Sequence, residues 1–394
     1  HAENRFSGSV LVAHGDEVIF EGGFGEANRS WHVPNRPDTV FLVGSVSKQF
    51  TSMLILQLAA EGKLSLMDPL PKHLPDYPAD KANITIHQLL SHASGMPHYA
   101  GIAQLGVDLG EYLRLDKPVS EYVELIGRLE LQSEPGTEFS YSSMGYIVLA
   151  HIAELVSGKS YAQLIEERIA SPIGVNDLGF AYNDRLVERL ASGYVYEIQT
   201  TDDGKLTLGY IPEPYRDQSN KYSTGGVHAS VQALFHWARA VVGDELLEAS
   251  YRDRMFTPQI GTYGYGWRIE PGDSIGLPEE VEVISHGGSL SGYRASIVIL
   301  DRGRYTIIAL GNSDASRSGA LTSGIAQLLW GQVPDAPQIL GTAVAWRMVK
   351  DGEDVAADFF RQQKEAGYPD YLNTDFAFYA FAERFAGLDR PDYG

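Results

Sequence analysis

The sequence contains no cysteine among its 394 residues. Disulfide bonds, thiol nucleophiles and cysteine-ligated metal sites are therefore excluded. Basic residues are also scarce, because 31 Lys and Arg stand against 51 Asp and Glu, which gives a formal net charge of −20. So acidic a surface repels polyanions, and we expect no nucleic-acid partner.

Long hydrophobic runs are missing as well. No apolar stretch reaches about 18 residues, the length at which a transmembrane helix becomes a candidate, so no membrane span is predicted. The hydrophobic share of 44% is nevertheless ample for a large core. The first residue is His1 rather than methionine. From this we expect that a signal peptide has been removed and that the protein is exported, either periplasmic or secreted.

Strand patterns occur at both ends of the chain, and helix patterns lie between them. Residues 6–25 contain two β-runs around the turn HGDE, and later β-rich stretches are YGYGWRIE, VEVISHGG, YRASIVIL and YTIIALG. In the middle, Thr85 is expected to cap a helix that stops at Gly95. The simplest packing is an α+β fold: one antiparallel sheet built from N- and C-terminal strands and flanked by helices, with a helical lobe inserted at roughly residues 60–190.

The last part of the chain differs from the rest. After the linker VPDAP, the stretches TAVAWRMV, DVAADFFRQQKEAG and FAFYAFAERFAG have apolar stripes at helical spacing. We expect a main domain at residues 1–333 and a C-terminal helical extension at residues 334–394. Because apolar stripes are costly to leave in water, the extension is predicted to dock on the main domain or on a second copy, as in a homo-oligomer.

One serine and one lysine have the spacing of a catalytic pair. In FLVGSVSKQF, Ser45 precedes Lys48 by three residues, where a strand pattern passes into TSMLILQLAAEG, which looks like an amphipathic helix. Residues at this spacing share a helix face, so the Lys48 amine is within reach of the Ser45 hydroxyl. A serine hydroxyl needs a nearby base, and a lysine made neutral by burial supplies one. The spacing alone is weak evidence for a catalytic pair, because a serine at a helix start also serves as a cap.

Two further segments strengthen the hypothesis. PGTEFSYSSMGY places Tyr141 in a loop just before a helix, and ISHGGSLSGYRAS breaks a β-run with Gly287 and Gly288 after His286. Glycines at such a position indicate a close approach between the backbone and a ligand. Together the three segments match, in order, the motifs of penicillin-recognising serine hydrolases: Ser-x-x-Lys, Tyr-x-Asn and Lys/His-x-Gly.

On these motifs the chain resembles class C β-lactamases, D-alanyl-D-alanine carboxypeptidases and the related esterases and D-peptidases. FLVGSVSKQFTSMLILQLAAEGKLSLMDPL is similar to the nucleophile helix of that family and the turn after it. ITIHQLLSHASGMPHY resembles its Leu-Leu-Ser-His-x-Ser-Gly segment, and STGGVHASVQALFHWA resembles the glycine pair and helix found further on. The resemblance covers about residues 5–331 and not the extension. It calls for no cofactor and no metal ion.

The resemblance implies a role for each matching residue. Ser45 is expected to attack a carbonyl carbon and form an acyl-enzyme, while Lys48 accepts or relays its proton. Tyr141 is expected to pass a proton to the leaving group and to help activate the deacylating water. The backbone N–H groups of Ser45 and Ser289 are expected to form the oxyanion hole. His286 is expected to donate to the substrate or to tune Tyr141.

The second motif departs from the family pattern, because Ser143 stands where asparagine is usual. A serine side chain is shorter and has one donor, so the hold on an acylamino substrate is weaker. Arg294 is a candidate for binding a substrate carboxylate, with a surface salt bridge as the alternative. We therefore predict a serine hydrolase that acts on a small ester, a β-lactam or a short peptide. An esterase or D-stereospecific peptidase is favoured over an efficient β-lactamase.

Other functions stay open from the sequence. The chain fits a β-lactamase or a D-alanyl-D-alanine carboxypeptidase, and it also fits a sensor or scaffold that acylates once and does not turn over. Ser313, in GNSDA, imitates the nucleophile elbow of α/β-hydrolases, but no histidine follows His286 to complete the order Ser…Asp…His. His87 and His92 are five residues apart and form no known metal motif.

Overall fold

The computed structural model describes residues 6–180, 182–201, 203–332, 334, 358 and 362. The predicted C-terminal helical extension at residues 334–394 therefore lies outside the described residues, apart from three positions. Within the described ranges, no helix is both long and apolar enough to cross a bilayer.

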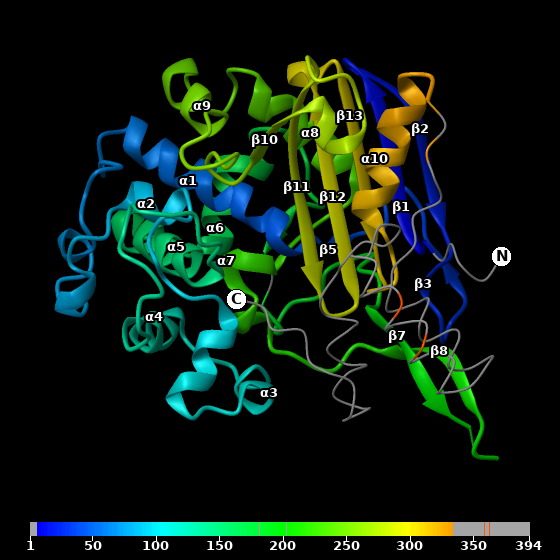
Figure 1. The fold of residues 1–394 in the computed structure, drawn as a ribbon, viewed down its shortest axis with the longest axis horizontal. Coiled ribbons are helices and arrows are strands. Elements are labelled where there is room, and N and C mark those ends of the chain that lie inside the picture. Colours follow the sequence, from blue (N-terminus) through cyan, green and yellow to red (C-terminus); the bar gives the residue numbers. More distant parts are fainter. Residues whose placement is uncertain are drawn as a thin grey trace.

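A six-stranded antiparallel sheet joins the two ends of the chain, as the sequence predicts. Its strand order is β10-β11-β12-β13-β1-β2. The N-terminal strand pairs with the last strand, with Leu11 opposite Ile308. Figure 1 shows this sheet beside the helices, with the blue N-terminal strands next to the yellow C-terminal ones. The strands are β1 (Gly8–His14), β2 (Glu17–Phe24), β10 (Arg268–Pro271), β11 (Glu282–Leu290), β12 (Tyr293–Leu300) and β13 (Tyr305–Gly311).

The alternation of side chains along β1 explains why helices cover both faces of the sheet. Val10 and Val12 belong to a cluster that packs against α10 (Ser318–Leu329). Leu11 and Ala13 point the other way, into the main core. On that side α8 (Val231–Val242) packs against β1 and β13. The α+β fold class is thus confirmed.

The helical lobe is organised around one central helix, α1 (Ser47–Ala60). The other helices are α2 (Ile86–Leu90), α3 (Leu109–Tyr112), α4 (Val119–Gly127), α5 (Ser143–Ser157), α6 (Tyr161–Ile165), α7 (Tyr222–Gly225) and α9 (Ala249–Met255). Within α1, every residue except Gln57 and Ala60 is buried. The expectation of an amphipathic helix is therefore wrong: α1 is surrounded by other helices, and it packs against α5, α6, α7 and α9.

Short strands complete the fold around the start of α1. A three-stranded sheet has the order β5-β9-β6 and fixes the segment that leads into α1. In it, Phe41 lies opposite Ala229 and Leu42 opposite His228. The remaining strands are β3 (Glu26–Asn28), β4 (Val33–Pro34), β5 (Phe41–Leu42), β6 (Gly179–Phe180), β7 (Tyr194–Thr200), β8 (Leu206–Pro212) and β9 (Val227–Ala229).

One predicted helix boundary is wrong. Thr85 caps α2 as expected, and its hydroxyl accepts from the Gln88 N–H. The helix nevertheless ends at Leu90 rather than at Gly95. Gly95 has a φ of +71°, and a Cβ there would lie 2.1 Å from the Ser133 carbonyl oxygen. The glycine is needed for this tight passage and not for stopping the helix.

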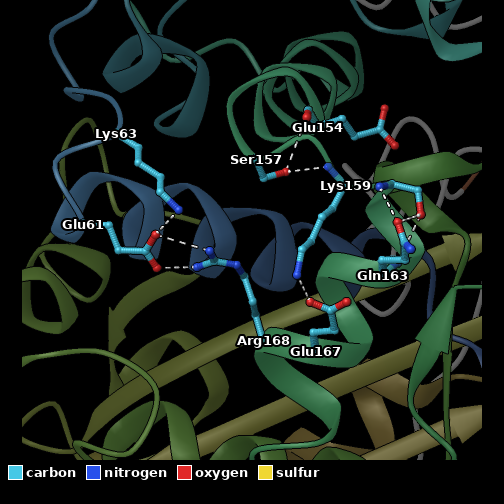
Figure 2. A network of polar contacts seen from close by, with 9 residues as sticks. Glu61, Lys63, Glu154, Ser157, Lys159, Gln163, Glu167 and Arg168 are labelled. Carbon is cyan, nitrogen blue, oxygen red and sulfur yellow. Dashed lines mark hydrogen bonds and ion pairs between the residues drawn. The ribbon is translucent and has the colours of Figure 1, made fainter.

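Surface ion pairs connect the residue after the C-terminus of α1 to the helical lobe (Figure 2). Arg168 binds the Glu61 carboxylate with both terminal nitrogens, at 2.6 and 3.3 Å, and Lys63 binds it at 2.7 Å. Mainly because of the Arg168 hydrogen bonds, the pKa of Glu61 falls to about 2. Nearby, Lys159 pairs with Glu167. Such exposed pairs contribute little stability individually, so the central packing of α1 depends on its buried side chains.

Asn312 is expected to stabilise the junction where β13 ends. Its buried amide donates to the carbonyls of Glu26 and Ser192, both at 2.9 Å, and its oxygen accepts from the Ser7 hydroxyl at 2.8 Å. Asn312→Ala removes these three hydrogen bonds, and a buried group left unsatisfied costs roughly 1–3 kcal/mol. The Ser7 hydroxyl keeps its contacts with Asn35 and with the Glu26 carbonyl. We expect the free energy of unfolding, measured in urea, to fall by about 3 kcal/mol.

Exposed Asn83 provides the matched control, and Asn83→Ala should change stability by less than about 0.5 kcal/mol. Equal effects of the two substitutions would contradict the role of Asn312.

Candidate active site

Ser45 lies at the turn between β5 and α1. It sits within a short 3-10 turn, Gly44–Val46, just before α1 begins. Every other residue from 41 to 50 is buried, whereas Ser45 is partly exposed. Ser45 is therefore the one residue of this segment that is partly accessible to a substrate. Gly44 has a φ of +55°, and a Cβ there would lie 2.7 Å from the Ser289 nitrogen, so only glycine fits between the turn and β11.

Lys48 is buried completely beside Ser45. Its Nζ donates to the Ser45 hydroxyl at 3.3 Å, to the Ser143 hydroxyl at 3.2 Å and to the Thr224 carbonyl at 3.4 Å. None of these oxygens is charged, and no ion-pair partner of Lys48 occurs among the residues that the structure describes. Burial therefore lowers the pKa of Lys48 from 10.5 to about 7. A neutral amine next to a serine hydroxyl is the arrangement that a general base requires.

Tyr141 lies in a loop directly before α5, as predicted. Its ring centroid is 4.9 Å from the Lys48 nitrogen. Its hydroxyl is buried and has no hydrogen bond of good geometry among the described residues, although Ser45 is close enough to counteract part of the effect of burial. Burial dominates and raises the pKa of Tyr141. The hydroxyl therefore stays protonated at neutral pH and can donate a proton.

Strand β11 brings the third motif to the same place. The prediction that two glycines break this strand is wrong, because β11 runs without interruption through Gly287 and Gly288. A Cβ on Gly288 would lie 2.0 Å from the Val43 carbonyl oxygen, whereas a Cβ on Gly287 would meet nothing closer than 3.9 Å. Gly288 is thus the residue that lets β11 pass close to the Ser45 turn. The Ser289 nitrogen then lies beside Gly44, the residue that precedes Ser45.

His286 is buried, and both of its ring nitrogens have protein partners. Nδ1 lies 2.6 Å from the Gly287 carbonyl oxygen and donates to it, so Nε2 accepts from the Tyr263 hydroxyl at 2.9 Å. Burial lowers the pKa of His286 to about 3, with the Lys48 charge as a further cause. The ring is therefore neutral and shows no free donor toward a substrate. Its ring centroid is 6.3 Å from that of Tyr141.

Arg294 is held away from Ser45 by its own hairpin. Its Nη1 donates to the carbonyls of Leu290 and Tyr293, at 2.6 and 2.9 Å. Burial lowers its pKa, and the charge of Asp314 acts in the opposite direction. No carboxylate lies within 4 Å of the guanidinium among the described residues, so the structure shows no surface salt bridge here.

Two histidines of this site were not assigned to it from the sequence. His92 has a φ of +57°, and its Nδ1 accepts from the Ser142 N–H at 3.1 Å, next to Tyr141. His98 lies at the rim, and its Nε2 is 3.3 Å from the Ser143 hydroxyl. Both are in ITIHQLLSHASGMPHY, which resembles a family segment, but no local spacing links that segment to Tyr141. Among the described residues, no group of three His, Asp or Glu side chains is arranged to hold a metal ion.

Comparison with known proteins identifies the family. The β-lactamase family model matches residues 1–328. The chain belongs to the β-lactamase family. It is 29% identical to penicillin-binding protein 4* of Bacillus subtilis over 352 residues, which cover 85% of this chain and 75% of that protein. It is 30% identical to the putative penicillin-binding protein PbpX of B. subtilis over 333 residues, which cover 83% of this chain and 76% of that protein.

Solved structures agree with this assignment. The penicillin-binding protein from Bacillus halodurans superimposes with a TM-score of 0.68 at 26% identity, covering 82% of this chain and 96% of that one. The β-lactamase/transpeptidase fold expected from the sequence is thus confirmed, and the chain is a serine hydrolase of the β-lactamase family.

Gly288→Ala is expected to lower kcat/KM of this β-lactamase-family enzyme by about 100-fold or more, the scale of a lost oxyanion-hole donor. The reason is the clash of the new methyl group with the Val43 carbonyl, which forces β11 away from Ser45. Gly287→Ala, on the same strand but with open space, should retain activity within about threefold. Activity is measured with an activated ester, and folding of both variants with thermal unfolding. Full activity in Gly288→Ala would show that this approach is unimportant.

The activity of the enzyme is expected to rise with pH through an acidic limb centred near 7. Lys48 has a pKa of about 7, and only its neutral form can accept the proton of Ser45. The measurement is kcat/KM between about pH 5 and 9. A flat profile over this range would contradict the role of Lys48.

The same pKa predicts an effect on stability. From pH 7 to 10.5 the unfolded chain holds a proton on Lys48 that the native state has lost, so the contribution of Lys48 to stability rises with pH over this interval. Below pH 7 the buried ammonium destabilises the native state, and Lys48→Met should raise the free energy of unfolding there by a few kcal/mol, with an upper bound of about 5 kcal/mol.

Proposed function

We propose that this enzyme hydrolyses small carboxylic esters, and more slowly amides, through an acyl-enzyme formed on Ser45. The observation that supports the proposal most strongly is the Lys48 amine. It lies 3.3 Å from the Ser45 hydroxyl and is buried without a countercharge among the described residues. A buried neutral base beside a partly exposed serine fits nucleophilic catalysis better than it fits a structural role.

Acylation begins when Lys48 accepts the hydroxyl proton of Ser45 and the Ser45 oxygen attacks the carbonyl carbon of the substrate. The negative charge then develops on the carbonyl oxygen, toward the N–H groups of Ser45 and Ser289. As the tetrahedral intermediate collapses, the bond to the leaving group breaks and Tyr141 protonates that group. The proton on Lys48 returns to Tyr141, so the protons balance at the end of the step.

Deacylation follows the same path with water as the nucleophile. Water loses a proton to Lys48, directly or through Tyr141, and attacks the acyl carbon. The Ser45 oxygen then leaves and regains its proton, and the carboxylic acid departs. The raised pKa of Tyr141 favours this hydroxyl as a relay and proton donor rather than as a standing anionic base.

His286 is assigned a positioning role in this proposal. Because its nitrogens bind Gly287 and Tyr263, it has no hydrogen to offer a substrate in this arrangement. It instead orients the backbone of β11 next to Gly288, and so supports the oxyanion hole. This replaces the direct contact with substrate that the motif implies.

Ser143 and Arg294 support a preference for esters. Ser143 is buried, and its oxygen is already shared by Lys48 and His98, so it is a poorer holder of an acylamino group than an asparagine amide. Losing one neutral hydrogen bond costs roughly 2–10-fold in affinity. Arg294 donates to its own hairpin and shows no orientation toward a substrate carboxylate. Both observations disfavour penicillins and D-alanyl peptides relative to simple esters.

The test is intact-mass spectrometry and turnover with a panel made of a short-chain ester, a penicillin and a D-alanyl peptide. We expect rapid turnover of the ester, and slow or absent turnover of the penicillin. Ser45→Ala should abolish covalent labelling, whereas Ser313→Ala should not. Labelling of Ser45→Ala at the normal rate would refute the nucleophile. Faster hydrolysis of penicillin than of the ester would refute the substrate preference, and acylation without turnover would favour a sensor.

A further inference from the structure

His98 and Lys48 both contact the hydroxyl of Ser143. The Ser143 oxygen lies 3.2 Å from the Lys48 nitrogen and 3.3 Å from Nε2 of His98. Ser143 begins α5, whereas His98 belongs to the loop that follows Pro97. The contact with His98 therefore depends on tertiary packing.

The other nitrogen of His98 determines where its proton lies. Nδ1 accepts the backbone N–H of Tyr99 at 2.7 Å. A nitrogen that accepts this bond carries no hydrogen, so the hydrogen of the neutral ring is on Nε2. Burial, together with the Lys48 charge, lowers the pKa of His98 to about 4. His98 is partly open to solvent, which weakens the effect of burial. The hydrogen bond that Nδ1 accepts also lowers the pKa, because only the neutral ring can accept it. Nε2–H thus donates to the Ser143 oxygen at neutral pH.

The ammonium form of Lys48 needs that same oxygen. Its three hydrogens have three acceptors, namely the oxygens of Ser45, Ser143 and Thr224. When Nε2–H of His98 also points at the Ser143 oxygen, two positive hydrogens converge on one acceptor. The hydroxyl oxygen has two lone pairs and accepts both bonds, but the positive end of the Nε2–H dipole then lies at the oxygen that Lys48 also contacts. A nearby positive hydrogen disfavours the ammonium form of Lys48 more than the neutral amine.

We propose that His98 is a positioning residue of this active site, whose Nε2–H shares the Ser143 oxygen with Lys48 and, through its positive hydrogen, favours the unprotonated form of Lys48 that accepts the Ser45 proton. The inference rests on the proposed role of Lys48 as base. It also gives Ser143 a second function: the serine couples a histidine at the rim of the site to the buried lysine.

Among the described residues around Lys48, no titrating group competes with this effect near neutral pH. The imidazoles that interact electrostatically with Lys48 have lowered pKa values. The neighbouring tyrosines have raised pKa values. The charge of Arg268 acts on several members of the cluster. These groups are His92, His286, Tyr99, Tyr141, Tyr146 and Arg268.

The test replaces the donor and keeps the ring. In His98→Phe, the aromatic ring that stacks near Tyr141 is retained, but Nε2–H is lost. We expect the acidic limb of kcat/KM to move up by about 0.5–1 pH unit, the shift that one neutral hydrogen bond can produce. The plateau at high pH should be unchanged within about twofold. His98→Gln, which has an amide donor, should restore part of the shift.

Two controls separate this proposal from a structural role and from failure of the proposed function. In a Ser143→Ala background, His98→Phe should produce no further shift, because its target is gone. The titration of Lys48 is also measured directly, by NMR of ¹³C-labelled lysine, and this measurement does not depend on turnover.

If His98→Phe leaves the Lys48 titration unchanged, the proposal is wrong even when the enzyme turns over normally. A loss of the high-pH plateau without a shift would likewise overturn it in favour of a structural role. If Lys48 shifts as expected but no substrate is turned over, only the proposed function fails.

Discussion

The site depends on the burial of one amine among uncharged oxygens. A lysine ammonium in a dry interior normally requires a carboxylate, because desolvation penalises the charge. Lys48 has three neutral acceptors instead, and its pKa falls to about 7. A pKa near 7 is the property that a general base needs to work near neutral pH, as the proposed function requires of Lys48. It requires that α1 be buried along almost its whole length, which the packing of α5, α6, α7 and α9 around it achieves.

The imidazoles and phenols around Lys48 are neutral at physiological pH. Burial lowers the pKa values of His92, His98 and His286, and it raises those of Tyr141 and Tyr263. A carboxylate among them would restore the ammonium form and remove the base. The acidic residues that dominate the composition are accordingly absent from the contacts of Lys48 within the described ranges. The site thus relies on fixed dipoles and hydroxyl hydrogens rather than on charge pairs, and such preorganised dipoles are well suited to stabilise a transient oxyanion.

Joining the two ends of the chain in one sheet brings the third motif to the first. β1 pairs with β13, β13 with β12, and β12 with β11, so the C-terminal strands are aligned beside the segment that leads into α1. The close contact between β11 and the turn that contains Ser45 is possible because Gly44 and Gly288 have no side chain. A Cβ at these positions would lie 2.7 and 2.0 Å from backbone atoms. Stability and function therefore share a constraint, since the sheet that forms the core also places the Ser289 nitrogen beside the nucleophile turn.

The sequence by itself determined the local elements and the order of the motifs. Runs of β-forming residues separated by turns predicted β1, β2, β12 and β13. The Thr85 cap and the Ser45–Lys48 spacing depend on backbone geometry within a few residues, and these predictions agree with the structure. The end of α2 at Leu90, the enclosure of α1 and the unbroken course of β11 were decided only by tertiary packing. So were the partners of His286 and the place of His98 next to Ser143. A hydrogen bond across 45 residues leaves no periodic trace in the sequence, because its geometry is set by how the lobe folds against α5 and not by local conformational preference.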